Sequence, residues 1–577
     1  MPHKIRFGAC VCLCWGTLWC APLLALEARL EVAAPKPVRE ILVREMDMSR
    51  WLGRPELSLD FLRRLHARAP ADIADLLATQ GYYAPKVDPA LIERDGVWIA
   101  RYGVNTGAQA RVARVALTFD GAIDTATAAR LRAQWRLPAG AAFNHAAWED
   151  AKKDILRSLV VERFPAARIV ASEAKVNAAK AQVDLVLAID SGPAFRFGAV
   201  EIEGLDRYPR SLIDGLSPIQ PGADYRQADV LELQTRLQNS GYFASVAVIA
   251  DPETAVANVL PVRVRVTEQP ARHIGFGIGF STDTGPRGSI QYGDRNVRDR
   301  GWRNKTTLEL DRTKAAIADS LDLPQKSDGT RDSITAAYVR KDIENEITDT
   351  TRLGFARTRP WQRFERTFAL QYFYEQQQVG DVRTDSHQAL TGNITLLRRQ
   401  LDDPVAPRRG YALNLQLGGA HQDLLADQSF LRVYGRALRY LLARERHGLS
   451  ARLELGYVAA ESRFGIPTDF LFRAGGDQSI RGYAYQSLGV REGDAVVGGR
   501  YVATASAEYT YWLKPNWGMA VFYDAGNAVD ARDAFEPVAG YGTGLRWRSP
   551  VGAVQLDAAY GEALDRWRAH FSLGFVF

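Results

Sequence analysis

The chain of 577 residues is too long for one ordinary hydrophobic core, so we expect several domains. Its 48 glycines, 10% aromatic residues and only 4 methionines are typical of a β-rich protein, and its mean hydropathy of −0.21 argues against a bundle of membrane helices. The formal net charge of +6 comes without the clustered basic residues that nucleic-acid binding requires.

Residues 1–25 have the layout of a secretory signal peptide. Lys4 and Arg6 precede a short apolar run that ends in small residues near Ala25. All four cysteines lie in this segment, so we expect an exported chain without thiols, disulfides or a cysteine metal site. The expected cleavage site lies between Ala25 and Ala28.

The next part of the chain, up to residue 268, repeats weakly at intervals of roughly eighty residues. Gln80-Gly-Tyr-Tyr-Ala-Pro85 is similar to Ser240-Gly-Tyr-Phe-Ala-Ser245, and helical apolar faces and alternating strands follow one another in a similar order. The order strand, helices, strand, strand predicts three small α+β modules. Their predicted bounds are residues 26–107, 108–192 and 193–268.

The turn Gly241-Tyr242-Phe243 and its counterpart Gly81-Tyr82-Tyr83 resemble the turn before the second strand of a POTRA domain. The middle module departs from this pattern, with Arg163-Phe164-Pro165 in that place. Open sheet edges of such modules can accept an added strand from another protein. The alternative is that the modules serve only as spacers.

In residues 269–577 apolar residues recur mainly at every second position. In Tyr501–Tyr511 the odd positions are apolar and the even positions mainly polar, with Glu508 among them. Aromatic residues at both ends of an apolar face are typical of a strand that crosses a bilayer. Met519, Val521 and Tyr523 form another apolar face, which places Asp524 on the polar one.

Strands exposed to lipid must close into a barrel, because lipid cannot satisfy free backbone groups. The length of this half predicts about 16 antiparallel transmembrane strands. Hydrophilic stretches such as Lys314–Asp332 are predicted as external loops. A soluble β-sandwich or propeller is the alternative, but its alternating faces would need a second sheet to cover them. With a cleaved leader, the barrel predicts the outer membrane of a Gram-negative-type cell, with the modules in the periplasm.

Several motifs occur in order across this half of the chain. They are Ser281-Thr-Asp-Thr-Gly-Pro286, Ile480-Arg-Gly-Tyr483 in the glycine-rich stretch Phe472–Gly489, Phe522-Tyr-Asp-Ala-Gly526, Gly544-Leu-Arg-Trp-Arg-Ser-Pro-Val-Gly552, Asp557 and the terminal Phe577. Together they resemble the BamA/TamA superfamily of outer-membrane assembly proteins. Three modules and this length resemble its TamA branch.

The resemblance implies a loop that folds back into the lumen and is locked there by an arginine. The implied lock residues are Ile480, Arg481, Gly482 and Tyr483 in the loop, with Glu508, Asp524 and Gly526 on the wall. A guanidinium is a planar fork suited to carboxylates.

The resemblance also implies a weak lateral seam between the first and last strands. Its expected residues are Gly275, Gly277 and Gly279 on the first strand, and Gly574 and Phe577 at the end of the last. Glycine weakens a strand interior, and a poorly paired edge can template another strand. The glycines would equally make room for the folded-in loop.

The function that the resemblance implies is insertion or translocation of β-barrel proteins and autotransporters. The implied partners are a TamB-like periplasmic protein, unfolded outer-membrane clients and the lipid bilayer, with no nucleic acid and no cofactor. The alternative is a two-partner-type secretion pore that exports a polypeptide. Catalytic motifs such as Gly-x-Ser-x-Gly or His-Glu-x-x-His do not occur, so we do not expect an enzyme.

Overall fold

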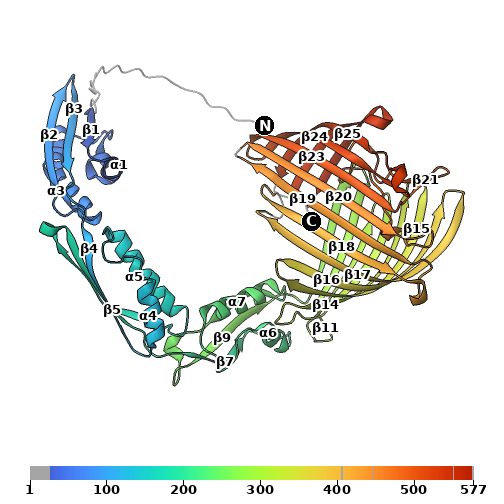
Figure 1. The fold of residues 1–577 in the computed structure, drawn as a ribbon, viewed down its shortest axis with the longest axis horizontal. Coiled ribbons are helices and arrows are strands. Elements are labelled where there is room, and N and C mark those ends of the chain that lie inside the picture. Colours follow the sequence, from blue (N-terminus) through green and yellow to red (C-terminus); the bar gives the residue numbers. More distant parts are fainter. Residues whose placement is uncertain (1–25, 404–406, 445, 550–551, 575–577) are drawn as a thin grey trace, which may run out of the picture. The chain divides into compact units, whose positions relative to one another are not determined.

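The computed structural model describes residues 26–403, 407–444, 446–549 and 552–574. The predicted signal peptide, residues 1–25, and Phe577 lie outside the described residues. Three small sheets precede a large β-barrel along the chain (Figure 1). The chain divides into two compact units, and the larger one contains the barrel together with parts of the third small sheet.

Each of the three modules has a three-stranded sheet with its third strand in the centre, in the orders β1-β3-β2, β4-β6-β5 and β7-β9-β8. The module strands are β1 (Ala28–Ala33), β2 (Lys86–Arg94), β3 (Val97–Asn105), β4 (Arg111–Asp120), β5 (Arg168–Asn177), β6 (Gln182–Asp190), β7 (Arg196–Glu203), β8 (Phe243–Ile249) and β9 (Val259–Glu268). The helices are α1 (Lys36–Glu45), α2 (Asp47–Trp51), α3 (Leu59–Thr79), α4 (Thr125–Ala133), α5 (His145–Val160), α6 (Ser211–Leu216) and α7 (Gln227–Asn239).

The helices form where their apolar residues recur at helical spacing. In α5 the buried side chains include Trp148, Ile155 and Leu159, which pack on the alternate residues of β6. Asn144 caps this helix by accepting a hydrogen bond from the backbone N–H of Ala147. The POTRA-type fold predicted for this part of the chain is therefore confirmed, whereas the exact domain bounds remain predictions.

The barrel contains sixteen antiparallel strands that close in chain order. They are β10 (Arg272–Ser281), β11 (Gly285–Val297), β12 (Trp302–Leu310), β13 (Lys314–Asp322), β14 (Arg331–Ile343), β15 (Glu346–Trp361), β16 (Phe364–Val379), β17 (Arg383–Leu401), β18 (Gly410–Ala420), β19 (Phe430–Ala443), β20 (His447–Ala459), β23 (Tyr501–Lys514), β24 (Trp517–Val529), β25 (Val538–Ser549), β26 (Gly552–Gly561) and β27 (Arg566–Gly574). A short hairpin, β21 (Val490–Glu492) and β22 (Ala495–Val497), forms a separate two-stranded sheet and is not part of the barrel wall.

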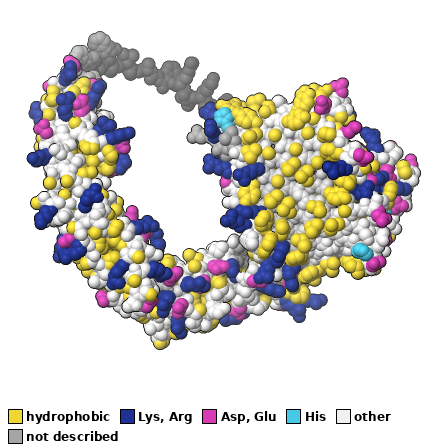
Figure 2. Space-filling view, viewed as in Figure 1, with side chains coloured by type: hydrophobic (Ala, Val, Ile, Leu, Met, Phe, Trp, Pro, Cys, Tyr) yellow, Lys and Arg dark blue, Asp and Glu magenta, His cyan; other side chains and the backbone are white. Residues whose placement is uncertain are grey.

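Side chains alternate between the two faces of the wall. Large apolar residues such as Phe276, Leu353 and Val521 are exposed on the outside, and hydrophobic side chains cover most of the outer wall that Figure 2 shows. This apolar outer face is what a surrounding bilayer requires. The predicted barrel is confirmed. No helix in the described ranges has the length and apolar character needed to cross a membrane.

The prediction of an external loop at Lys314–Asp332 is wrong. Residues Lys314–Asp322 form strand β13, and only the part that follows is a turn before β14. The stretch looked hydrophilic because the inward face of a barrel strand is polar, and Asp319 accepts hydrogen bonds from Asn304 and Thr306 on β12.

The strand order defines two ends of the barrel. We call the end at which β10 begins the proximal end, and the opposite end the distal end. Because the strands alternate in direction, the connection of residues 460–500 between β20 and β23 leaves the wall at the distal end. We call this connection the plug loop.

Candidate functional site

The plug loop lies against the inner side of the wall. Phe472, Ile480 and Tyr483 are buried in one apolar cluster with wall residues such as Phe373 and Val502. Backbone bridges join Phe472 to Gly499 and Ala474 to Leu488, so the loop folds back on itself. These contacts place the loop inside the barrel.

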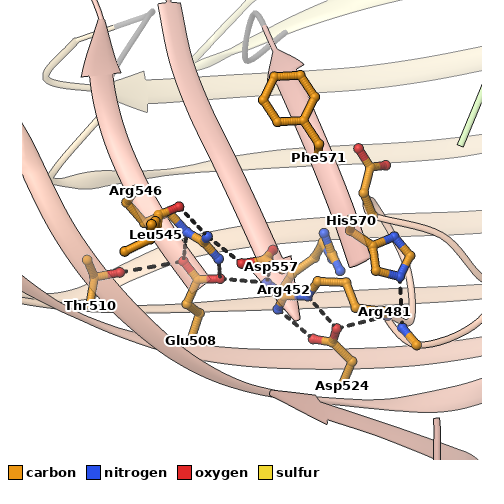
Figure 3. Close-up of polar contacts among 12 residues, drawn as sticks. Arg452, Arg481, Glu508, Thr510, Asp524, Leu545, Arg546, Asp557, His570 and Phe571 are labelled. Carbon is orange, nitrogen blue, oxygen red and sulfur yellow. Dashed lines mark hydrogen bonds and ion pairs between the residues drawn. The ribbon is translucent and has the colours of Figure 1, made fainter. Parts of the chain in front are cut away.

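Arg481 lies at the centre of this packing and is only 4% exposed. Its Nε and Nη2 donate to the two carboxylate oxygens of Asp524 on β24, at 2.7 and 2.9 Å. Its Nη1 donates to Glu508 on β23 at 2.8 Å, and the backbone N–H of Arg481 also donates to Asp524. The structure thus brings the three predicted charged residues together (Figure 3).

Two further charged residues complete the cluster. Nη1 of Arg481 also donates to Asp557 on β26, at 3.2 Å. Arg546 on β25 donates to both Glu508 and Asp557, with 2.6 Å between its Nη2 and Glu508 Oε2. Two guanidinium groups therefore share three carboxylates, contributed by the loop and four neighbouring strands. We call these five residues the lock.

Asp557 and the Gly544–Gly552 segment are sequence motifs, but neither Asp557 nor Arg546 was predicted to belong to the lock. Their signal is present, because both occupy inward positions of alternating strands. The sequence does not show how far along the barrel axis each of them lies. That position depends on the register between β25 and β26, which pairs Arg546 with Gln555 and Gly544 with Asp557.

The other predicted loop residues pack around the lock. Guanidinium carbon Cζ of Arg481 lies 3.4 Å from the centre of the Phe522 ring. Gly482 has a left-handed φ of +95°, and a Cβ there would lie 2.8 Å from the backbone N of Gly561. Gly526 faces the backbone of β23, where a Cβ would lie 2.1 Å from the carbonyl oxygen of Ala503. The Tyr483 hydroxyl donates to the carbonyl of Ala539 at 3.0 Å.

The plug loop has further anchors on the opposite part of the wall. Thr468 donates through its backbone N–H and its hydroxyl to Glu375 on β16, both at 2.8 Å. Asp469 pairs with Lys341 on β14, and Arg473 pairs with Glu346 on β15. This second set of contacts was not predicted from the sequence.

A third set lies near the distal rim. Glu492 in the β21–β22 hairpin accepts from Arg383 on β17 at 2.9 Å and from Arg463 at 2.7 Å. Arg463 and Arg500 also pair with Asp530, at the end of β24. The loop is therefore held on several sides of the barrel.

The predicted seam joins β10 and β27. Among the described residues these strands share a single register pair, Ser281 with Ser572, whereas β10 pairs with β11 along its 10 residues. The backbone N–H of Thr282 also donates to the carbonyl of Phe571 at 3.2 Å. Gly574 pairs with Ala553 on β26. Backbone pairing across the seam is thus sparse.

The three glycines of β10 face inward, and Ile274, Phe276, Ile278 and Phe280 face outward. Polar side chains of β11 fill the space beside two of these glycines. A Cβ on Gly277 would lie 2.4 Å from Oγ of Ser289, and one on Gly279 would lie 3.3 Å from the Arg287 guanidinium. The glycines therefore make room for β11 side chains, a role that the sequence analysis did not assign.

A polar contact links both seam strands to the plug loop. His570 on β27 accepts a hydrogen bond at Nε2 from the backbone N–H of Gly482, at 3.0 Å. Its Nδ1 lies 3.5 Å from Asp283, in the turn after β10. Asp283 in turn accepts from the backbone N–H of Asp477 at 2.8 Å. First strand, last strand and plug loop meet at these side chains.

The charged groups of the site are paired with one another inside the wall, so they hold the plug loop in position. In the ranges that the structure describes, no group of three or more His, Cys, Asp or Glu side chains could hold a metal ion.

Comparison with known proteins shows which families the chain resembles. Residues 271–577 match the model of the Omp85 superfamily domain, and residues 195–269 match a POTRA model described as surface antigen variable number repeat.

Two relatives share the name outer membrane protein assembly factor BamA. The protein from Nitratidesulfovibrio vulgaris is 24% identical over an alignment 583 residues long, and the alignment covers 93% of this chain and 70% of the relative. The protein from Neorickettsia risticii is 22% identical over 520 residues, covering 84% and 68%.

Among solved structures, BamA from Haemophilus ducreyi lacking POTRA domains 1–3 superimposes with a TM-score of 0.68 at 17% identity, covering 80% of this chain and 99% of that structure. This likeness shows the fold. Because the superfamily model covers more than half of the chain, the protein belongs to the Omp85 superfamily.

Proposed function

We propose that this protein is an outer-membrane assembly factor of the TamA type, which helps insert or translocate β-barrel proteins and autotransporters. The observation that carries the proposal is the sparse pairing between β10 and β27: up to Gly574, where the described part of the last strand ends, the two strands share one register pair, and the outer face of β10 is strongly apolar. An unpaired strand edge is a template for an incoming strand.

The assembly function is supported by the superfamily and by two relatives named as assembly factors. Three module sheets precede the barrel in this chain, which agrees with the TamA type. In this proposal the open edges of the module sheets dock a TamB-like periplasmic protein, and the clients are unfolded outer-membrane proteins. The energy comes from strand pairing, without a cofactor.

A polypeptide secretion pore is the second candidate. Such a pore requires the plug loop to leave the lumen, and the three sets of anchors described above oppose that movement. The structure therefore favours assembly at the seam over export through the lumen.

A disulfide across the seam tests the proposal. Ser281 and Ser572 are register partners, and Cα atoms of antiparallel partners lie about 4.5–5.5 Å apart, within the range of a disulfide. Cells that carry only Ser281→Cys/Ser572→Cys should fail to assemble their autotransporters and recover on addition of a reductant. Surface display of the clients is the measurement.

The matched control is Ser333→Cys/Ala356→Cys, which joins register partners on β14 and β15 away from the seam. It should leave client assembly unchanged. Normal display by the oxidised seam variant would refute opening at the seam, and normal display in cells lacking the protein would refute the assembly function.

A further inference from the structure

Two arginines lie on the outer face of the wall near its proximal end. They are Arg398, near the end of β17, and Arg439, near the end of β19. Their positions alternate with inward residues and share a face with exposed apolar residues, such as Ile394 on β17 and Leu441 on β19. Figure 2 shows Lys and Arg side chains along the left margin of the barrel wall, beside the hydrophobic side chains of its outer face.

One aromatic ring joins the two arginines. Tyr411 lies on β18, the strand between them, and its register partners are Gln400 on β17 and Arg439 on β19. The guanidinium carbon of Arg398 lies 5.1 Å from the centre of the Tyr411 ring, and that of Arg439 lies 5.6 Å from it. Both distances are within the range of a cation–π interaction. The ring therefore holds two like charges close together on the outer face.

Neither Arg398 nor Arg439 forms an ion pair with a carboxylate of the described residues. Arg398 donates to the side-chain oxygen of Gln400, a neutral acceptor, at 3.5 Å. The turn after β17 contains two acidic residues, Asp402 and Asp403. Asp402 accepts from two backbone N–H groups of the same turn, at 2.8 and 3.0 Å, and Asp403 has contacts of its own.

Two other outward arginines of the wall are paired. Arg357 on β15 forms an ion pair with Asp332 at 2.6 Å, and Arg340 on β14 forms one with Asp349 at 3.0 Å. A charged side chain on a surface that faces lipid is costly unless it has a partner or reaches the interface. An anion at the interface would supply Arg398 and Arg439 with the partner that Arg340 and Arg357 find within the chain.

Arg439 also lines a groove in the outer wall. The groove has a volume of about 380 Å³ and crosses β19, β20, β23 and β24. Its lining residues are Ala437, Arg439, Ala451, Arg452, Leu453, Ala505, Ser506, Ala507, Tyr523 and Ala525. Arg439 lies nearer to the proximal end of its strand than Ala525 does to that of β24, so the groove leads from the proximal margin into the apolar part of the wall.

We propose that this surface binds one anionic phospholipid, with its phosphate on Arg398 and Arg439 and an acyl chain in the groove. A phosphate matches the forked donors of arginine, and a headgroup with a net negative charge offsets the two positive charges. Tyr411 has the character of the aromatic residues that gather at the headgroup level of a bilayer. The groove lies on the face of the wall that meets the acyl chains, so a lipid fits it better than a soluble phosphate does.

This inference goes beyond the proposed function and does not rest on it. It requires only that the barrel lies in a bilayer, whichever polypeptides the protein assembles or exports. A lipid-binding experiment on purified protein therefore keeps the two apart, because client assembly in cells does not enter its readout.

The experiment uses the full-length protein in detergent micelles, titrated with phosphatidylglycerol or with phosphatidylcholine that carries the same acyl chains. Native mass spectrometry measures the affinity for the first bound lipid. Phosphatidylglycerol should bind at least about fivefold more tightly, and the difference should shrink as salt is raised. Glycerol 3-phosphate, which has the phosphate but no acyl chain, should not displace it at the same concentration.

The charge variant is Arg398→Gln/Arg439→Gln, which should lose at least about fivefold in affinity for phosphatidylglycerol and keep its affinity for phosphatidylcholine. The matched control, Arg340→Gln/Arg357→Gln, removes the same charge from outward positions that are paired within the chain, and should bind like the wild type. Heat-dependent gel mobility checks the folding of each variant, and Arg439→Gln alone replaces the double variant if that does not fold.

The groove variant is Ala507→Leu, which fills part of the groove and should weaken the binding of both lipids. Its control is Ala336→Leu, at an outward position of β14 away from the groove, which should leave binding unchanged.

Equal affinity for the two lipids, or unchanged affinity in the charge variant, would overturn the proposal. Displacement of the lipid by glycerol 3-phosphate would assign the arginines to a soluble phosphate and would overturn it as well. Equal losses in Ala507→Leu and Ala336→Leu would refute the place of the acyl chain in the groove.

Discussion

At the scale of single residues, Arg481 joins the plug loop to the wall through buried ion pairs. It meets carboxylates from three strands while almost fully buried, and Asp524 is 0% exposed. Inside a protein such charges are tolerated because they are paired, and removing one partner leaves the others without compensation. The lock is therefore more sensitive to losing a member than a surface ion pair would be.

Arg481→Met should lower the free energy of unfolding by about 3–5 kcal/mol, because Asp524 loses its bidentate partner in a buried site. Arg481→Lys should recover only part of the loss, since an ammonium lacks the planar fork. Urea unfolding in lipid vesicles, followed by tryptophan fluorescence, measures both variants. As a control, Arg340→Met removes a partly exposed pair with Asp349 and should cost less than about 1 kcal/mol.

A charge exchange between Arg481 and Asp524 should not restore stability. A glutamate at position 481 would face Glu508 and Asp557, which the structure places beside Arg481. Full recovery in Arg481→Glu/Asp524→Arg would show that Asp524 is the only partner that matters.

Glu268, the last residue of β9, fixes a loop of the third module. Its carboxylate accepts from the backbone N–H groups of Asp206, Arg207 and Tyr208, at 2.8 to 3.0 Å. Burial alone would raise the pKa of Glu268, but these backbone donors and the Arg207 guanidinium outweigh burial and hold the pKa below its ordinary value.

A carboxyl group whose pKa is lowered by folding stabilises the folded state above its unfolded pKa, and that contribution is lost as the pH falls through the folded pKa. The stability of the third module should therefore decrease below about pH 4, near the ordinary pKa of glutamate. In Glu268→Gln this part of the pH dependence should be absent. Hydrogen exchange of the backbone amides of residues 206–208 at several pH values is the measurement, and identical profiles for both proteins would contradict the assignment.

At the scale of elements, the plug loop is held in three places. The lock attaches it to β23, β24 and β26; Glu375, Lys341 and Glu346 attach it to β14 to β16; and Glu492 attaches it near the rim. Contacts this far apart on the wall act independently to a first approximation. The loss of one set should leave the loop in the lumen.

Arg481→Ala alone should therefore raise the conductance of the barrel in a planar bilayer only slightly. Adding Thr468→Ala, Asp469→Asn and Glu492→Gln should raise it strongly, because all three sets of anchors are then weakened. Deletion of residues 468–492 gives the fully open reference. A single Arg481→Ala variant with the conductance of the deletion would show that the lock alone holds the loop.

The elements of the seam contrast with the rest of the wall. Elsewhere neighbouring strands pair in long registers, such as those between β15 and β16. By contrast, β10 and β27 share one described pair, and beside it the backbone N–H of Phe571 donates to the hydroxyl of Thr282. In the proposed function this difference selects the place where a client strand is added.

At the scale of the whole molecule, the barrel has three regions of different chemical character. Its outside is apolar, its distal interior is filled by the plug loop, and its proximal interior contains a cavity of about 720 Å³ whose lining includes nine arginines.

The sequence by itself determined the class of fold, because periodicity is a local property of the chain. An alternation of two along Tyr501–Tyr511 and Met519–Asp524 already fixes which side chains face inward, and so predicts that Glu508 and Asp524 point into the lumen. Glycine-rich composition and the Arg481 motif likewise indicated the loop that would meet them.

Only the tertiary structure decided which inward residues lie at the same height and where the loop runs. Asp557 and Arg546 belong to the lock because of strand register. Glu375 and Lys341 contact Thr468 and Asp469 of the plug loop, from which 93 and 128 positions of sequence separate them. The cavity of the proximal interior arises in the same way, from residues on several strands that no local pattern connects. Such meetings depend on how many strands close the barrel and how they are staggered, which are properties of the closed wall and not of any one segment.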